Sequence, residues 1–160
     1  MTILISTSPE QTRQIGYYLG QLLDAGDVIC LDGDLGAGKT TFSAGVGEGW
    51  GTEHPLTSPT FVIVQQYDRA LDRQVLYHLD AYRLDAEGDA ESVGLLDIFD
   101  ANGAVLIEWP EKIRSWLPDD HLWIHFTIDD NDDSRRTLTL QAAGNRSLML
   151  LDVLKAKFGD

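Results

Sequence analysis

The sequence predicts an α/β fold of three layers, in which helices cover a mixed, partly parallel central sheet with antiparallel hairpin additions. Two short apolar runs, residues 28–32 and 104–108, are typical of strands that are buried on both faces of a sheet. Strand-like and helix-like segments alternate in the first half of the chain, which favours parallel pairing. Two pairs of strand-like segments joined by short polar links predict the hairpins.

Length and composition predict one globular domain spanning residues 1–160. The chain has 43% apolar and 24% charged residues, which is ordinary for a folded protein. Its 26 acidic residues outnumber its 12 basic residues, and the net charge of −14 opposes binding to nucleic acid and to anionic membranes. We therefore expect any role with nucleic acid to be indirect.

Targeting signals are not visible in the sequence. No apolar run approaches the roughly 18 residues of a membrane span, and residues 1–6 lack the basic region of a secretion signal. We expect a cytoplasmic protein. The single cysteine, Cys30, lies in an apolar run and is expected to be a buried packing residue.

The N-terminal segment predicts a strand at residues 2–6 and then a helix. Ser8, Pro9 and Gln11 supply an N-cap, a first-turn proline and a capping-box partner. Gly26 is a candidate end of this helix. One helical face collects the apolar residues Ile15, Tyr18, Leu19, Leu22 and Leu23.

The middle of the chain predicts a second helix at residues 41–50, whose three glycines each cost roughly 1 kcal/mol relative to alanine. This helix should be either short or tightly packed. Residues 60–67 and 75–80 predict two strands of a candidate hairpin. Residues 85–100 look helical in pieces, and Pro110 is a candidate start of a short helix.

The C-terminal part predicts a second hairpin, with strands at residues 122–128 and 136–140 on either side of an acidic turn at 129–133. Residues 148–158 have the apolar spacing of an amphipathic helix. The expected sheet therefore has antiparallel additions at both the middle and the end of the chain.

A complete Walker A motif, G-x-x-x-x-G-K-[ST], follows the first buried strand and precedes a helix, as the motif requires. Its glycines let backbone N–H groups turn inward around phosphate at a helix N-terminus. Lys39 can reach the terminal phosphates, and the Thr40 hydroxyl suits magnesium. We therefore predict a P-loop NTPase-like fold. The motif comprises Gly33, Asp34, Leu35, Gly36, Ala37, Gly38, Lys39 and Thr40.

Two carboxylates end strands near the crevice expected beside this loop. Asp80 ends the strand at 75–80, and Glu108 ends the second buried run. One could contact magnesium or its water shell while the other orients the attacking water, and the sequence leaves their order open. His78 is either a base or, as we favour, a packed or hydrogen-bonded neighbour of Asp80. Residues 58–61 are a candidate phosphate-sensing switch.

Four motifs resemble, in order, those of the TsaE family, also called YjeE: residues 33–41, 58–61, 77–84 and 107–111. The resemblance implies a bacterial ATPase that uses ATP and Mg²⁺. It also implies that the protein assists TsaB and TsaD in making threonylcarbamoyladenosine next to the tRNA anticodon. The transfer chemistry would then be that of TsaD, and tRNA would be met only through the complex.

The same resemblance implies roles for individual residues. Lys39 and Thr40 serve phosphate and magnesium, so that Thr40 is a candidate metal ligand. Asp80 and Glu108 serve metal binding and hydrolysis, and with Lys39 they are the candidate catalytic residues.

The nucleotide surroundings implied by the resemblance include Thr41, Thr60 and Trp109, besides the eight loop residues. One segment departs from the family pattern. At residues 44–49 the family usually has a stronger helix former and often a basic residue, whereas this chain has alternating glycines. The departure leaves partner contacts through this helix open.

Other functions share the Walker loop. A small-molecule kinase could use Arg83 or Arg114 towards a transferred phosphate, although no arginine-rich lid is visible. A nucleotide-dependent assembly switch would differ little in sequence. A GTPase is disfavoured because the guanine motif Asn-Lys-x-Asp is not found. For an ATPase we expect slow intrinsic hydrolysis, because no arginine is obviously placed as a finger and a partner can complete the site.

Overall fold

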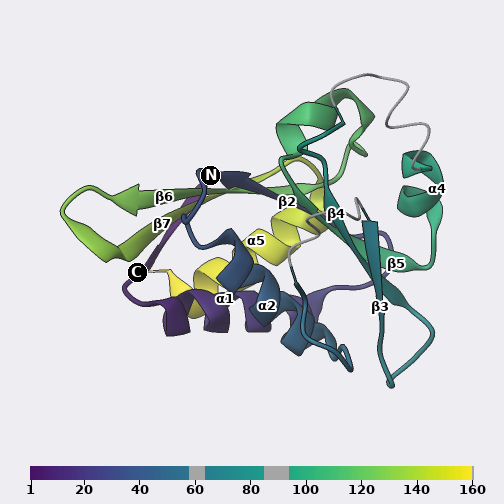
Figure 1. Ribbon diagram of the computed structural model, residues 1–160, viewed down its shortest axis with the longest axis horizontal. Coiled ribbons are helices and arrows are strands. Elements are labelled where there is room, and N and C mark those ends of the chain that lie inside the picture. Colours follow the sequence, from purple (N-terminus) through teal and green to yellow (C-terminus); the bar gives the residue numbers. More distant parts are fainter. Residues whose placement is uncertain (58–63, 85–93, 160) are drawn as a thin grey trace.

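The computed structural model describes residues 1–57, 64–84 and 94–159, and its centre is a seven-stranded sheet of order β1-β7-β6-β2-β5-β4-β3 (Figure 1). The strands are β1 (Thr2–Ser6), β2 (Val28–Gly33), β3 (Val64–Asp68), β4 (Val75–Asp80), β5 (Gly103–Glu108), β6 (Leu122–Asp129) and β7 (Asp132–Ala142). The helices are α1 (Pro9–Leu22), α2 (Lys39–Trp50), α4 (Leu95–Asp100), the 3-10 helix η1 (Pro110–Trp116) and α5 (Asn145–Phe158).

The sheet is mixed, as predicted. Strands β4, β5, β2 and β6 pair in parallel, and they form the centre of the sheet. Both predicted hairpins are confirmed, because β3 pairs with β4 and β6 pairs with β7 in antiparallel fashion. Strand β1 extends the sheet by antiparallel pairing with β7.

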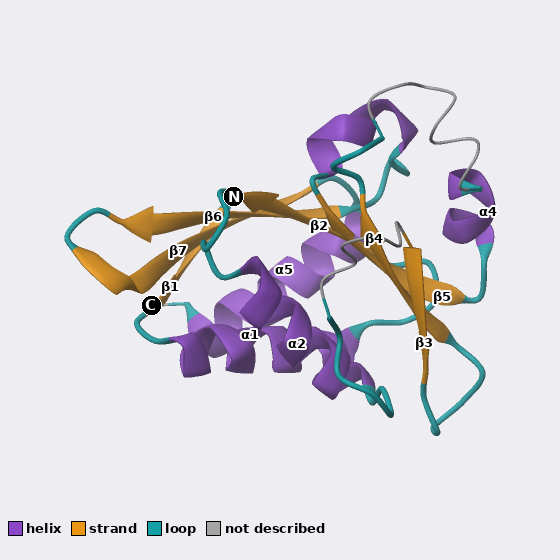
Figure 2. Cartoon of the chain, viewed as in Figure 1, coloured by secondary structure: helices purple, strands orange, loops and turns teal. Residues whose placement is uncertain are grey.

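Helices cover both faces of the sheet, which confirms the three layers. Along β2, Ile29 and Leu31 pack in a core with residues of α1, α2 and α5, which lie together on one side of the sheet (Figure 2). Val28 and Cys30 pack in a second core with residues of α4 and η1. Cys30 is fully buried, and burial raises the pKa of its thiol to about 12, so its predicted packing role is confirmed.

Helices α1 and α2 touch through their backbones. A Cβ atom at Gly45 would lie 2.1 Å from the carbonyl oxygen of Arg13, and one at Gly49 would lie 2.0 Å from that of Tyr17. Gly16 and Gly20 of α1 approach the α2 backbone in the same way. The glycines therefore do not shorten α2; they permit the tight packing that the sequence offered as one of two alternatives.

Some predicted boundaries were wrong. Helix α1 ends at Leu22, and Gly26, with a φ of +92°, lies in the turn before β2, where the Asp27 carboxylate accepts the N–H of Asp24. Strand β7 begins at Asp132 instead of residue 136, because its pairing with β6 continues to Asp129. Residues 58–63 and 85–93 lie outside the described residues. They include the candidate switch at 58–61, the start of the strand predicted at 60–67 and most of the segment predicted at 85–100.

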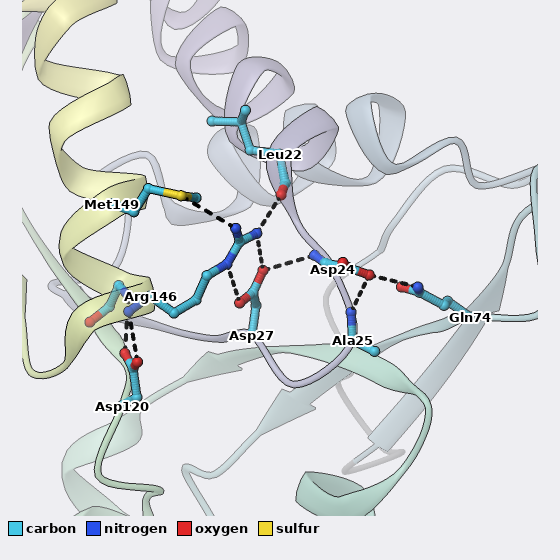
Figure 3. Close-up of polar contacts among 9 residues, drawn as sticks. Leu22, Asp24, Ala25, Asp27, Gln74, Asp120, Arg146 and Met149 are labelled. Carbon is cyan, nitrogen blue, oxygen red and sulfur yellow. Dashed lines mark hydrogen bonds and ion pairs between the residues drawn. The ribbon is translucent and has the colours of Figure 1, made fainter.

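Helix α5 begins at Asn145, three residues earlier than predicted, because a distant carboxylate caps it (Figure 3). The Asp120 carboxylate accepts the backbone N–H groups of Arg146 and Ser147, at 2.9 and 3.0 Å. The Arg146 guanidinium in turn donates to both oxygens of Asp27, at 2.9 and 2.8 Å. These contacts fasten the start of α5 to the turn before β2.

Asp120 should make stability depend on pH. Burial alone would raise the pKa of its carboxyl, but hydrogen bonds from Ser147 and the Arg146 N–H outweigh burial and hold this pKa below its usual range. Because the folded-state pKa is the lower one, the stabilisation is present above the unfolded-state pKa of about 4 and is lost as pH falls through the folded-state value.

We expect Asp120→Ala to lower the free energy of unfolding by about 1 kcal/mol near neutral pH, the usual cost of a lost helix cap. The difference from wild type should shrink in acid. Urea unfolding on both sides of the carboxyl titration measures it, with the exposed neighbour Asp119→Ala as control. A deficit that is the same at both pH values would contradict the capping role.

No helix within residues 1–57, 64–84 and 94–159 is long and apolar enough to cross a membrane.

Candidate nucleotide site

The Walker A segment joins the end of β2 to the start of α2. Gly36 and Gly38 have φ angles of +79° and +104°, in the left-handed region that favours glycine. Gly33 has a φ of +139°, and a Cβ there would lie 2.5 Å from the carbonyl oxygen of Phe126 on β6. The loop therefore needs these glycines for both its turn and its contact with the sheet.

The other loop residues divide between surface and core. Asp34 and Leu35 are exposed at the loop, and Ala37 is buried. Thr40 and Thr41 lie in the first turn of α2 and face a cavity of about 170 Å³. This cavity is lined by Pro9, Thr12, Gly36, Gly38, Lys39, Thr40, Thr41, Ser134 and Arg136.

The Lys39 side chain is buried between the loop and Trp109. Its Nζ donates to the carbonyl oxygen of Gly33 at 2.5 Å and lies 4.3 Å from the centroid of the Trp109 ring. Within the described residues, Trp109 is the one non-glycine residue with a positive φ, at 58°. This left-handed turn directly after β5 places the indole beside the lysine, and Tyr82 packs against the indole edge-on at 5.0 Å.

Asp80 and Glu108 end neighbouring parallel strands and are paired in register. Side chains alternate along a strand, so Glu108 projects from the same face of β5 as Leu106, which packs in the core beneath α1 and α2. By the same alternation Asp80 shares the face of Leu76 on β4. Both carboxylates therefore lie on the side of the sheet where α2 and its loop lie.

The two carboxylates differ in surroundings. Glu108 is buried, whereas Asp80 is half-buried and its Oδ1 accepts the N–H of Tyr82 at 2.9 Å. Burial raises the pKa of Asp80 above its usual range; the Tyr82 N–H opposes this shift, and the negative charge of Glu108 adds to it. A cation beside these two neighbouring carboxylates would stabilise their charged forms, because it offsets the repulsion between them.

His78 is packed, as one of the two predicted alternatives has it, but the hydrogen bond that its ring forms is with Glu108 and not with Asp80. Its Nε2 lies 2.9 Å from Oε2 of Glu108. His78 is in register with Leu106, so Glu108 is its diagonal neighbour on β5. The Glu108 side chain is long enough to reach this diagonal neighbour on the adjacent strand.

The structure adds residues that the sequence did not suggest. The Nη2 of Arg136, on β7, donates to the carbonyl oxygen of Gly36 in the loop at 3.2 Å. Pro9, Thr12 and Ser134 complete that wall of the cavity. No local motif marks these residues as part of a site. The pairing of β7 with the sheet brings Ser134 and Arg136 to the loop, and the packing of α1 against α2 brings Pro9 and Thr12. Thr60 lies outside the described residues.

The strand, glycine loop and helix at the centre of a three-layer mixed sheet define a protein of P-loop NTPase-like fold. The family model described as "Threonylcarbamoyl adenosine biosynthesis protein TsaE" matches residues 6–138, and the chain belongs to this family.

Relatives support this membership. The tRNA threonylcarbamoyladenosine biosynthesis protein TsaE of Bacillus subtilis is 40% identical over 149 residues, covering 93% of this chain and 90% of that protein. Its counterpart of the same name in Streptomyces coelicolor is 38% identical over 136 residues, covering 84% and 92%. The crystal structure of Bacillus subtilis YdiB superposes with a TM-score of 0.79 at 35% identity, covering 97% of this chain and 94% of that one.

Proposed function

We propose that this protein is a magnesium-dependent ATPase that acts in the biosynthesis of threonylcarbamoyladenosine in tRNA, together with TsaB and TsaD. The observation that supports it most is that Lys39, Asp80 and Glu108 lie around one Walker loop in a chain of the TsaE family. Because the proposed pathway modifies tRNA, we propose that the protein acts in the cytoplasm.

The loop fits the phosphates of ATP. Backbone N–H groups at the start of α2 point towards the position where phosphate binds in such loops. Lys39 donates to the oxygen of Gly33, and this carbonyl stands in for the phosphate oxygen that the lysine would meet. Trp109 would then hold the ammonium group from one side through its ring.

The oxygen donors fit magnesium. Residues 1–57, 64–84 and 94–159 contain no cluster of three or more His, Cys, Asp or Glu side chains that could hold an ion alone. Magnesium usually takes one or two carboxylates and completes its shell with phosphate and water oxygens. Thr40, Asp80 and Glu108 are the proposed ligands. Bound magnesium supplies charge neutralisation at the phosphates.

The two carboxylates would divide the remaining work. One holds the ion or its water shell, and the other accepts a hydrogen bond from the attacking water and orients it towards the terminal phosphate. Both lie on the sheet face that the loop occupies, which is the arrangement this division requires.

Hydrolysis of ATP with magnesium by the purified protein tests the proposal, alone and with TsaB and TsaD. We expect slow turnover that the partners increase and that Lys39→Ala, Asp80→Ala and Glu108→Ala each remove. Phosphorylation of an added small-molecule acceptor would instead indicate a kinase. Tight nucleotide binding without any turnover would indicate a passive assembly switch.

The isolated protein should bind free tRNA weakly, because its net charge of −14 repels phosphate. We expect a dissociation constant above about 10⁻⁴ M at physiological salt, weaker than ordinary non-specific binders. Fluorescence anisotropy of labelled tRNA measures it, with the TsaB–TsaD complex as comparison. Tight binding that falls steeply with salt would contradict the expectation.

Arg136 should contribute to nucleotide affinity, since it lines the cavity and contacts the loop carbonyl of Gly36. We expect Arg136→Ala to weaken ATP binding about tenfold or more, the usual effect of removing a hydrogen bond to a charged group. Calorimetry with a non-hydrolysable ATP analogue measures this. Arg135→Ala is the matched control, because Arg135 pairs instead with Asp129 on the hairpin surface. If the two variants bind the ATP analogue with equal affinity, Arg136 does not contribute to nucleotide binding.

A further inference from the structure

His78 and Glu108 form a buried pair on neighbouring strands. The side chain of His78 is 2% exposed and that of Glu108 is 9% exposed, and 2.9 Å separates Nε2 from Oε2. His78 lies two residues before Asp80 on β4, so the pair adjoins the proposed metal site from within the sheet. The imidazole is too deeply buried to meet a nucleotide itself, and its hydrogen-bond partner Glu108 is the group through which it can act on the site.

The hydrogen bond has a defined direction. A carboxylate oxygen accepts, so Nε2 carries the hydrogen and donates to Oε2. The other ring nitrogen, Nδ1, is buried without a hydrogen-bond partner within the described residues. In the tautomer with hydrogen on Nε2, this N–H donates to the Glu108 carboxylate. The buried Nδ1 then carries no hydrogen that would need an acceptor.

A glutamate side chain has three rotatable bonds, and burial alone does not select one rotamer. The hydrogen bond from His78 holds Oε2, so Oε1 is the oxygen that would meet the ion or the attacking water. Partners that hold a functional carboxylate in this way are worth about 10–100-fold in metal affinity or activity in known sites.

We propose that His78 is a positioning residue, which holds the Glu108 carboxylate in the orientation that the site needs. The proposal rests on the proposed ATPase function, since Glu108 is the group that His78 positions. Nothing in this role requires His78 to touch nucleotide or metal.

The first test compares two replacements at the same position. His78→Leu keeps a similar volume without a donor, and His78→Gln places an amide N–H at a reach similar to that of Nε2. With TsaB and TsaD present, His78→Leu should lower turnover about 10–100-fold while ATP affinity stays within about twofold, and His78→Gln should recover most of the loss. Equal turnover by wild type and His78→Leu would overturn the proposal.

A double-mutant cycle separates positioning from a general loss of structure. The cycle is measured on single-turnover rates with enzyme in excess over ATP, so that the slow residual reaction of Glu108→Ala can be followed. If His78 acts through Glu108, His78→Leu causes no further loss of this residual rate in a Glu108→Ala background. If the fold-losses of the two single variants multiply in the double variant, His78 does not act by positioning Glu108. Failure of wild type to hydrolyse ATP under all conditions would overturn the proposed function and this role with it, whereas a silent His78→Leu beside an inactive Glu108→Ala overturns only this role.

A readout without nucleotide or metal is available from NMR of the imidazole nitrogens, because the chain has 4 histidines. The signal of His78 is the one lost in His78→Gln. We expect the Nε2–H tautomer in wild type. Its signal should shift in Glu108→Ala, whereas the matched control Asp80→Ala should retain the Nε2–H tautomer. If the chemical shift of the His78 nitrogens is the same in wild type and Glu108→Ala, the hydrogen bond between His78 and Glu108 is overturned.

Discussion

Replacing Gly45 or Gly49 with alanine is expected to lower the free energy of unfolding by about 1–3 kcal/mol, in the range of overpacked cores. The new Cβ would lie 2.1 or 2.0 Å from a carbonyl oxygen of α1, and a helix backbone cannot move aside as a side chain can. Alanine also favours a helix by roughly 1 kcal/mol over glycine. The steric clash alone would therefore lower the free energy of unfolding by more than the net value, whereas helix propensity alone would raise it.

Gly47→Ala is the matched control on the same helix. Its Cβ would meet the Cδ1 atom of Leu56 at 2.3 Å, which is the end of a flexible side chain. We expect its free energy of unfolding to remain close to that of wild type. Urea unfolding followed by circular dichroism measures all three variants, and Gly45→Ala or Gly49→Ala as stable as Gly47→Ala would show that the helices can separate without cost.

The same packing bears on the departure from the family pattern. Gly45 and Gly49 face α1, where Gly45 is buried and Gly49 is half-buried, so these two positions offer little surface to a partner. The beginning of α1 contributes Pro9 and Thr12 to the cavity beside the loop. Tight contact between α1 and α2 therefore also fixes one wall of the candidate nucleotide site.

Glu108→Gln is expected to reduce ATP turnover by about 10²–10⁴-fold, the usual contribution of a positioned acid or base, while ATP still binds. The amide keeps the size of the side chain but removes the charge that would hold the ion or the water. Single-turnover phosphate release in the presence of TsaB and TsaD measures the rate, and equilibrium binding of an ATP analogue measures the affinity. Turnover at the wild-type rate would exclude Glu108 from the chemistry.

Asp80→Asn complements this experiment and decides how the carboxylates divide their work. The variant that lacks a direct metal ligand should need more magnesium for half-maximal turnover, whereas loss of the water-orienting group should lower the maximal rate at any magnesium concentration. A magnesium titration of both variants therefore assigns the two roles that the sequence leaves open.

Much of the fold was predictable because its signals are local. The runs at 28–32 and 104–108 are apolar on both faces, which only a strand in the middle of a covered sheet requires. The Walker motif fixed the junction of strand and helix, since its glycines are needed wherever that loop occurs. Asp80 and Glu108 were predicted to lie at strand ends, and β4 and β5 do end there.

Other features depend on segments far apart in sequence. Arg136 meets Gly36 only because the terminal hairpin pairs along the central strands, and Asp120 caps α5 across a separation of 26 residues. The sequence predicted that His78 is a packed or hydrogen-bonded neighbour of Asp80; it is packed, but the register of β4 against β5 makes Glu108 its hydrogen-bond partner. By itself the sequence determined that the sheet is mixed, that the Walker loop joins a buried strand to a helix, and that Asp80 and Glu108 end strands. Only the tertiary structure decided which side chains meet, because register and helix packing result from the sum of many weak contacts and not from any local pattern.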